Sequence, residues 1–570
     1  MAGNLPTASL PRHATRDAAV LIAGGGPVGL TTALLLAKHG IACTLIERRP
    51  PRVSSAPKAH VVNPRTLEIF RSLGVDFETL RQSGASRGDA EVSRFMTKLS
   101  GTELGHIPLD VSEVEALKVT PTPLLNIAQP KLESILAALV SENPYIDYRL
   151  GDAWVACRAE NGGVVSTIEQ GEGRSYEISS AYLVAADGAN SSVREFLDIP
   201  MDGIPAVRPR VTIHFEANLR HIVRDRPAIL YWILDPSAAG TFIAYDIDQT
   251  WVYTPRVTPA LFDRNEYSDA HCIELIRKAI GRDDVDLRIR HVVPWMMAAQ
   301  VATTYRRGSV LLVGDAAHRF PPTGGFGLNT GIQDAHNLAW KIASVLRNPD
   351  DDALLDSYDW ERRPIAEINT RQSLHNSNRL PDLFSLAEET IVDGQVSGAD
   401  VRRLAAEIGT HREHFLSPGL QLGYCYGPPV SGPAEPTRYE PSARDGDRMP
   451  HAWVARGQQR LSTLDLLDPT SFTLLAGIDG AGWRSAVSGL DSVQTVILDD
   501  GFIFESDWLS LCGLAGASAM LVRPDGHIAK IVADDTPASR EAVVETLAKW
   551  GIRAGDGGRS AETDAITGMQ

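Results

Sequence analysis

The sequence predicts an α/β protein built from three parts, and three observations support this prediction. An apolar strand, a glycine-rich turn and an alanine-rich helix follow one another in residues 18–47. Alternating aromatic and β-branched segments fill residues 205–300, as in an antiparallel sheet. A stretch rich in proline and glycine at 427–450 precedes a region where short strands and helices alternate. We therefore expect a parallel sheet with helical crossovers, an antiparallel sheet inserted between its halves, and a separate small α/β domain.

Composition limits the class of protein. The 570 residues are 43% hydrophobic and 22% charged, which is typical of globular domains. The net charge of −16 argues against a general affinity for nucleic acid or anionic membranes. Apolar stretches fall short of the about 18–20 residues of a membrane span. Five scattered cysteines without a C-x-x-C pair predict neither a zinc site nor a dithiol centre. We expect a cytoplasmic protein without a metal.

The first unit, residues 18–47, carries a phosphate-binding pattern. Gly24, Gly26 and Gly29 stand in the G-x-G-x-x-G register, between an apolar strand and a helix. The first glycine permits a tight turn, the second lets a pyrophosphate approach the backbone, and the third packs helix against strand. Glu47 ends the next strand, where an acid can bind a ribose hydroxyl. The pattern predicts a Rossmann-like dinucleotide site. It occurs once, which favours a resident flavin over a resident nicotinamide cofactor.

A second strand-to-helix turn follows residues 182–186 (YLVAA). Asp187 ends the strand, Gly188 makes the turn, and Ser191 or Ser192 is placed to cap the next helix. Arg194 is expected to reach across the first turn of that helix. Taken alone, a capped turn without a ligand explains this segment equally well.

A third turn, GDAAHRFPPTGGFGLN, follows the apolar strand at 310–313. Asp315 is predicted at the carboxyl edge of the sheet, where α/β proteins bind ligands. Pro321 and Pro322 stiffen the chain. A glycine cluster at 324–327 leaves bare backbone N–H groups at the start of a helix. The arrangement favours binding of a group that carries or develops negative charge.

Together, GGGPVGL, ADGANSSVR and GDAAHRFPPTGGFGLN resemble, in order and spacing, the motifs of single-component (class A) FAD-dependent aromatic hydroxylases, the family of para-hydroxybenzoate hydroxylase and phenol hydroxylase. YEPSARDGDRMPH and LVRPDGHIA resemble the branch with a C-terminal thioredoxin-like domain. The resemblance implies the following order. A Rossmann-like FAD-binding domain comprises residues 18–200 and 301–430; about 85–110 join the substrate domain, and the second part includes a helical extension. A substrate-binding β-sheet domain occupies 201–300. A linker at 431–450 leads to a thioredoxin-like domain without C-x-x-C at 451–570.

The resemblance also implies a reaction. NADPH or NADH reduces FAD, O2 adds at flavin C4a, and the resulting hydroperoxide hydroxylates a phenolic or polycyclic aromatic substrate. Pro322 and Gly325 would support catalysis through the electrostatics of the loop beside the flavin. The residues implied at the cofactor are Gly24, Gly26, Pro27, Gly29, Glu47, Arg48, Lys58, Gln129, Asp187, Gly188, Asp315, Pro322, Gly325, Gly327, Leu328 and Asn329. Lys58 stands where this family usually has arginine, and it lacks the planar guanidinium fork.

The sequence does not identify the catalytic base. Candidates in the inserted sheet are His214, Tyr231, Tyr245 and Asp246, although a packed sheet position is the commoner role for each. His318 and His336 are expected to be structural, and the pair His411 and His414 is expected on a solvated helix face rather than at a metal.

Several alternatives also stay open. Oxidative decarboxylation, Baeyer–Villiger oxidation and epoxidation use the same scaffold, and a non-catalytic flavoprotein could sequester an intermediate. The aromatic substrate and a homodimer are likewise undecided by the sequence.

Overall fold

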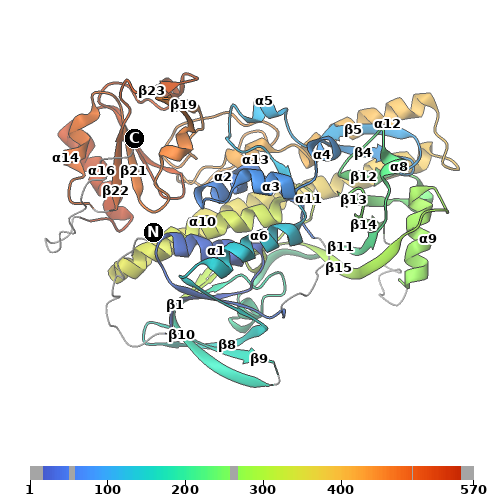
Figure 1. Ribbon diagram of the computed structural model, residues 1–570, viewed down its shortest axis with the longest axis horizontal. Coiled ribbons are helices and arrows are strands. Elements are labelled where there is room, and N and C mark those ends of the chain that lie inside the picture. The colour runs from blue at the N-terminus through green and yellow to red at the C-terminus, as the bar shows by residue number, and fades with distance from the viewer. Residues whose placement is uncertain (1–16, 51–57, 172, 257–266, 491, 554–570) are drawn as a thin grey trace. The chain divides into compact units, whose positions relative to one another are not determined.

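The structure is a computed structural model that describes residues 17–50, 58–171, 173–256, 267–490 and 492–553 (Figure 1). The chain divides into two compact units, Met1–Pro441 and Ser442–Gln570. The boundary lies within 431–450, the stretch expected to be a linker. Within the described ranges, no helix is both long and apolar enough to cross a membrane.

The first unit contains a mainly parallel sheet. Its strand order is β16 (Arg306–Arg307), β17 (Val310–Leu312), β10 (Arg174–Ala185), β1 (Ala18–Ala23), β2 (Cys43–Glu47) and β7 (Ile146–Leu150), with β8 (Asp152–Glu160) and β9 (Gly163–Gln170) joined antiparallel through β10. Val20, Leu21 and Ile22 of β1 are fully buried. Their continuous apolar run reflects a strand covered on both faces. The helices α1 (Pro27–Lys38), α6 (Gln129–Glu142) and α10 (Phe326–Arg347) form a layer along β1 (Figure 1).

A second, mainly antiparallel sheet lies beside the first. Its strand order is β18 (His318–Arg319), β15 (Arg288–Ala302), β11 (Met201–Glu216), β14 (Thr250–Pro255), β13 (Gly240–Asp246), β12 (Leu230–Ile233), β4 (Val92–Met96) and β5 (Glu103–Pro108). β4 and β5 come from an earlier part of the chain, and β4 pairs parallel to β12. Residues 92–108 therefore join the sheet formed largely by 201–302.

Helices cover both faces of this second sheet. On one face, α9 (Asp269–Ile280) packs on a core that includes Phe215 and Trp251. On the other, α11 (Asp356–Thr390) and α12 (Gly398–Thr410) pack around Trp232. The sequence pattern in 205–300 indicated strands only, whereas α9 interrupts them. Ser268 caps α9 by accepting the His271 N–H, and Gly281 ends it at φ +81°.

The remaining helices and short strands of the first unit connect these layers. They are β3 (Val61–Val62), α2 (Pro64–Ser72), α3 (Phe77–Ser83), α4 (Arg87–Ala90), α5 (Glu113–Ala116), β6 (Leu125–Asn126), α7 (Ser192–Phe196), α8 (Arg220–Val223) and α13 (Pro418–Leu422). β3 pairs with β6, so the segment after Lys58 is held in an extended conformation.

The second unit is a mixed α/β domain with a thioredoxin-like arrangement. Its central sheet has the order β22 (Val493–Ile497), β21 (Phe472–Ala476), β24 (Ala519–Val522) and β25 (Ile528–Val532), with β21 and β22 parallel. A small sheet of β19 (Trp453–Arg456), β20 (Gln459–Ser462) and β23 (Phe502–Phe504) adjoins it, and α14 (Trp483–Ala486), α15 (Trp508–Leu511) and α16 (Pro537–Lys549) complete the domain. Burial raises the pKa of the Cys512 thiol to about 12, so this cysteine is protonated at neutral pH.

Candidate active site

The three turns predicted from the sequence meet at one edge of the parallel sheet. β1, β10 and β17 are parallel neighbours, with β10 in the middle. Gly24 follows β1, Asp187 follows β10, and Asp315 follows β17. All three turns therefore lie at the carboxyl ends of adjacent strands, where open α/β sheets bind ligands.

The first turn is crowded at Gly24 and Gly29 and open at Gly26. Gly24 has φ +109°, and a Cβ on it would lie 2.3 Å from the Ala186 carbonyl oxygen. A Cβ on Gly29 would lie 1.9 Å from the Gly24 carbonyl oxygen. Apart from its neighbours along the chain, no described atom lies within 4 Å of a Cβ placed on Gly26. Pro27 begins α1, and no side chain caps this helix. The open space before uncapped N–H groups fits the pyrophosphate of a dinucleotide.

Glu47 is held at the end of β2 as a buried carboxylate. Its Oε2 accepts the Gly25 N–H at 2.7 Å, and its Oε1 accepts the Arg49 backbone N–H and Nε at 2.9 Å each. Burial opposes ionisation, but the hydrogen bonds from Arg49 and Gly25 outweigh it and lower the pKa of Glu47. The carboxylate is therefore charged and oriented to accept a ribose hydroxyl. Arg48, named from the resemblance, is exposed, and its neighbour Arg49 makes the ion pair.

Asp187 forms the second turn. Its Oδ2 accepts the Val193 N–H at 3.1 Å, while its buried Oδ1 has no hydrogen-bond partner among the described residues. Burial raises the pKa of this carboxyl. Gly188 completes the turn at φ +86°. A buried oxygen without a partner at this edge fits a ligand hydroxyl, because unsatisfied buried acceptors are costly.

Arg194 connects the second turn to the third. Its Nη1 donates to the Ala189 carbonyl at 3.3 Å and to the Ala316 carbonyl at 3.2 Å. The sequence predicted a contact across one helical turn, and the contact to Ala316 joins segments 122 residues apart. The guanidinium therefore fixes the position of Asp315 relative to Asp187.

The third turn presents bare backbone at the start of α10; we call residues 320–329 the flavin loop. Asp315 is exposed, and a Cβ on Gly327 would lie 3.8 Å from its Oδ1. Gly324 and Gly325 have φ of +109° and +65°, and no side chain caps α10. Pro322 is exposed. These N–H groups and the positive end of a 22-residue helix favour a negative charge at the loop.

Asn329 and Gln129 hold the neighbouring chain rather than leaving their amides free. Asn329 Oδ1 accepts the Asn63 N–H at 2.9 Å, and its Nδ2 donates to the carbonyls of Val61 and Gly325 at 3.0 and 2.7 Å. Gln129 Oε1 accepts the Ala59 N–H at 3.2 Å. The 58–62 segment is therefore clamped against the flavin loop. Two other residues predicted from the sequence to bind the cofactor differ in burial: Lys58 is exposed and Leu328 is half-buried.

A buried polar network supports the flavin loop from behind. His318 Nε2 lies 2.9 Å from Asp334 Oδ2, and Arg362 Nε donates to Asp334 Oδ1 at 2.8 Å. Arg362 Nη1 donates to the Tyr426 hydroxyl at 2.9 Å. Burial opposes the charge on Asp334, but Arg362 and His318 lower its pKa. His318 in β18 therefore contacts the buried carboxylate of α10, and His336 is buried on α10 itself.

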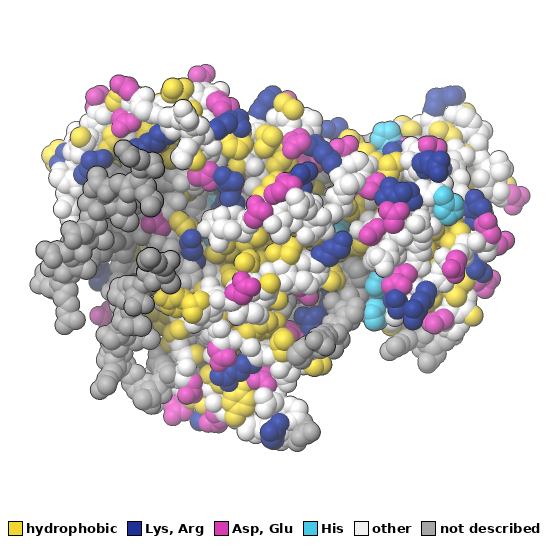
Figure 2. Space-filling view, in the orientation of Figure 1, with side chains coloured by type: hydrophobic (Ala, Val, Ile, Leu, Met, Phe, Trp, Pro, Cys, Tyr) yellow, Lys and Arg dark blue, Asp and Glu magenta, His cyan; other side chains and the backbone are white. Residues whose placement is uncertain are grey.

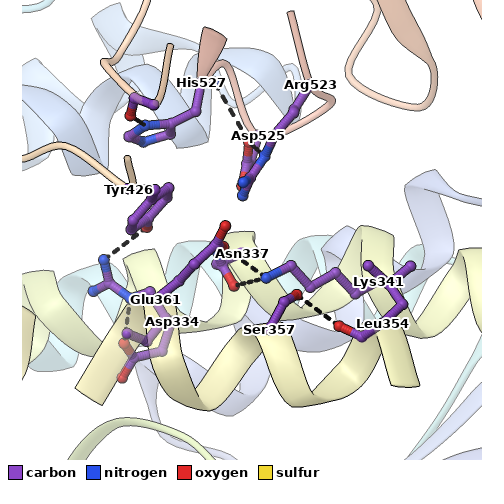
Figure 3. A network of polar contacts seen from close by, with 12 residues as sticks. Asp334, Asn337, Lys341, Leu354, Ser357, Glu361, Tyr426, Arg523, Asp525 and His527 are labelled. Carbon is purple, nitrogen blue, oxygen red and sulfur yellow. Dashed lines mark hydrogen bonds and ion pairs between the residues drawn. The ribbon is translucent and has the colours of Figure 1, made fainter. Parts of the chain in front are cut away.

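Figure 3 shows an adjoining set of contacts between α10 and α11. Lys341 Nζ donates to Glu361 Oε2 at 2.7 Å and to Asn337 Oδ1 at 2.8 Å, and Asn337 Nδ2 donates to Glu361 Oε2 at 2.7 Å. Because each charge in this buried set has an opposite partner, the two helices are locked in one register.

The structure separates the four base candidates. The Tyr231 hydroxyl donates to the Arg226 carbonyl at 3.0 Å within the core under α9. Burial and the neighbouring His291 ring, 5.6 Å away, lower the pKa of His214 to about 4. Asp246 accepts the Asp248 N–H in a turn at 3.0 Å. The Tyr245 hydroxyl is buried without a partner among the described residues, and burial raises its pKa.

Tyr245 lies against a residue that the sequence analysis missed, His60. The two rings meet edge to face with centroids 5.8 Å apart. Asn126 Nδ2 donates to the Ala90 carbonyl at 3.3 Å, so its Oδ1 faces His60 Nδ1 at 2.9 Å. Nδ1 must then carry the proton, which leaves Nε2 as a bare acceptor. Burial lowers the pKa of His60, although the bond to Asn126 opposes this. The only sequence signal was its place two residues after Lys58.

His411 and His414 correct one sequence expectation. Both are buried rather than solvated, because His411 ends α12 and the chain then turns into the core. His414 stacks on Phe415 with centroids 4.4 Å apart, and burial lowers the pKa of His414 to about 3. No group of three or more His, Cys, Asp or Glu residues that could hold a metal occurs in the described ranges.

Comparisons with known proteins agree with this geometry. Family models described as "FAD binding domain" and "Aromatic-ring hydroxylase, C-terminal" match residues 17–373 and 442–554. Tetracenomycin A2 monooxygenase-dioxygenase from Streptomyces glaucescens is 31% identical over 551 residues, and 2,4-dichlorophenol 6-monooxygenase from Cupriavidus pinatubonensis is 30% identical over 564; each match covers 90% of this chain and 93% of the relative.

Solved structures that are similar along almost the whole chain include two with bound FAD. The flavin-dependent monooxygenase PieE, in complex with FAD and substrate, has a TM-score of 0.83 at 30% identity, covering 94% of this chain and 100% of that one. A ternary complex of aklavinone-11 hydroxylase with FAD and aklavinone has a TM-score of 0.79 at 29% identity, covering 94% and 99%.

Proposed function

Because the chain belongs to the family of FAD-dependent aromatic-ring hydroxylases, we propose that it hydroxylates a phenolic or polycyclic aromatic compound with O2 and NADPH or NADH. One oxygen atom of O2 enters the ring, the other leaves as water, and the nicotinamide supplies two electrons. FAD, when bound, supplies the electron transfer and oxygen activation. The observation that carries the proposal is the meeting of the three turns at one sheet edge, beside the 58–62 segment and the second sheet.

The cofactor's binding is assigned to the three turns. Gly24, Gly26 and Gly29 admit the pyrophosphate, Glu47 takes the adenosine ribose, and Asp315 takes hydroxyls nearer the ring. The N–H groups around Gly325, at the start of α10, stabilise negative charge on the ring system. Pro322 gives the loop a rigid wall, because its φ is restricted.

We assign proton transfer to His60 and Tyr245. His60 Nε2 is neutral and lacks a partner among the described residues, so it is suited to accept the proton of a phenol. The Tyr245 hydroxyl stays protonated because burial raises its pKa. It can therefore donate a hydrogen bond to the phenolate oxygen that forms. A phenolate is more electron-rich than a phenol, which favours attack on an electrophilic oxygen.

The decisive experiment measures NADPH and NADH oxidation by the FAD-loaded protein across phenols and polycyclic aromatics, followed by the mass and the NMR spectrum of the product. Catalase and a peroxide assay separate coupled hydroxylation from peroxide release. We expect aromatic-dependent reductant use and a product heavier by one oxygen atom. Loss of carbon dioxide, an inserted ester oxygen or an epoxide in the product would identify another reaction of the same fold. If no aromatic compound allows NADPH or NADH to reduce the bound flavin, the proposal that the protein is an enzyme is refuted.

A cytoplasmic location is proposed from the cysteines, because none of the five, all within the described ranges, forms a disulfide bond. Fractionation of the producing cells tests it. A homodimer is tested by sedimentation velocity of the FAD-loaded protein.

A further inference from the structure

Two arginines on β11 share a face of the second sheet with residues that adjoin the flavin loop. Arg208 pairs with Met297 and Arg210 with Trp295 across the β11–β15 ladder. Directly opposed residues in such a ladder project from the same face, so all four side chains lie on one side. A register shift between Ile204 and Arg208 sets this face.

Helix α11 connects this face to the flavin loop. The Ser377 hydroxyl donates to Met297 Sδ at 3.6 Å. One turn earlier on α11, the Ser373 carbonyl accepts the Thr323 hydroxyl at 2.6 Å. Thr323 belongs to the flavin loop, directly after Pro322. The face that carries Arg208 and Arg210 is therefore the face that α11 connects to the flavin loop.

The two guanidinium groups have no counter-charge in the described part of the chain. Both side chains are half-buried, and neither makes a hydrogen bond or ion pair with a described residue. A third cation, Arg256, follows β14 next to them; it pairs with Glu388 and covers the Phe384 ring at 5.1 Å. Burial, Arg208 and Arg256 lower the pKa of Arg210 to about 10. Among the described residues, the cluster is a concentration of like charge, and no carboxylate pairs with Arg208 or Arg210.

Two buried arginines of the first unit have partners. Arg362 binds Asp334 and Tyr426, and Arg194 binds two carbonyls. On the face shown in Figure 2, acidic and basic side chains are intermixed, so the exposed surface there is not broadly basic. Desolvating an unpaired charge costs free energy, so an anionic group of a ligand would stabilise Arg208 and Arg210.

We infer that the aromatic substrate carries a carboxylate, which binds Arg208 and Arg210. This inference rests on the proposed function for the identity of the ligand as substrate. Arginine forks match the two oxygens of a carboxylate, and residues two apart on a strand are separated by about 7 Å, which lets both reach one carboxylate. Trp295 adds a flat surface beside Arg210, and its Nε1–H is held by Thr212 Oγ1 at 2.9 Å. An aromatic ring attached to the carboxylate can stack there.

The test uses matched ligands with the FAD-loaded protein. Phenol is compared with 3-hydroxybenzoate, and 2-naphthol with 3-hydroxy-2-naphthoate, by flavin absorbance changes that report binding without turnover. We expect the acid to bind at least about 10-fold more tightly than its neutral partner in one pair or both. Equal affinities in both pairs overturn the inference.

Variants locate the binding site. Arg208→Gln and Arg210→Gln should each weaken binding of the acid by about 10- to 100-fold, as expected for loss of a charged hydrogen bond, and leave the neutral ligand unchanged. Arg288→Gln, on an exposed position of the same sheet, is the matched control. Equal losses for acid and neutral ligand, or an equal loss in Arg288→Gln, overturn the inference. Acid binding that needs both arginines but never supports reductant oxidation upholds the site and refutes the hydroxylase.

Discussion

Replacing His60 by glutamine tests the assigned proton transfer. Glutamine can still donate to Asn126 Oδ1, as His60 Nδ1 does at 2.9 Å, but it offers no basic nitrogen in place of Nε2. A phenol with a pKa of about 10 is ionised to roughly one part in 300 at pH 7.5. Without a base, the enzyme depends on that fraction, so kcat/KM should fall about 300-fold, or about 3 kcal/mol.

The pH dependence sharpens this prediction. Burial places the pKa of His60 below its usual 6.5, so wild-type activity should hold at neutral pH and fall only when acidification protonates the ring. The His60→Gln variant should instead regain activity as pH rises toward the pKa of the substrate phenol. A more acidic chlorinated phenol should be less affected by the substitution.

The assay is steady-state hydroxylation from pH 6 to pH 10, with bound FAD measured in every preparation. His375→Gln, on an exposed part of α11, is the matched control. The reasoning is refuted if His60→Gln keeps more than about a third of the wild-type kcat/KM at pH 7.5, since general bases contribute at least about 100-fold. A loss that is the same at every pH and for every phenol would indicate a packing role instead.

Three further predictions concern cofactor binding and stability. Gly26→Ala should fold normally but bind FAD at least about 10-fold more weakly. Gly29→Ala should lose thermal stability as well, because its Cβ would lie 1.9 Å from the Gly24 carbonyl oxygen. Normal FAD binding by Gly26→Ala would contradict the assignment of the pyrophosphate to this turn. Arg362→Met removes the guanidinium partner of the buried Asp334, which then keeps only His318 and the Gly314 N–H, and should cost about 3–5 kcal/mol in urea unfolding. A cost below about 1 kcal/mol would show that Asp334 is neutral. His414 has a lowered folded pKa of about 3, so the unfolded state takes up its proton first as pH falls below 6.5, and stability is lost progressively down to about pH 3. At pH 5 this loss is about 2 kcal/mol, and His414→Gln should remove it; an unchanged acid dependence would place the effect elsewhere.

Local steric rules explain what the sequence predicted well. Strand, turn and helix at 18–38 follow from an apolar run and from glycines such as Gly29, whose Cβ position is blocked by the backbone of Gly24, five residues earlier. Such features depend on a few consecutive residues. The same holds for Ser191, whose hydroxyl caps the Arg194 N–H as the sequence pattern indicated.

Contacts between distant segments required the tertiary structure. Tyr245 and His60 meet although 185 positions separate them, and nothing in either segment marks the other. Strand periodicity assigned Tyr231 and Tyr245 equally to the sheet, but only the packing of α9 places Tyr231 in a hydrophobic core. His411 and His414 looked solvated because the helix before them is polar, and the turn that buries them is a long-range contact.

The sequence by itself determined the cofactor-binding turns and the family, because glycine sterics and helix starts are local and leave a readable pattern. Only the tertiary structure decided which polar groups share the face of the second sheet that is proposed to bind the substrate. A register shift between Ile204 and Arg208 directs Arg208 and Arg210 to that side, and moving a strand by one residue reverses its faces. The negative charge of the substrate is therefore predicted from the fold, whereas the protein's flavin chemistry was predicted from the sequence motifs.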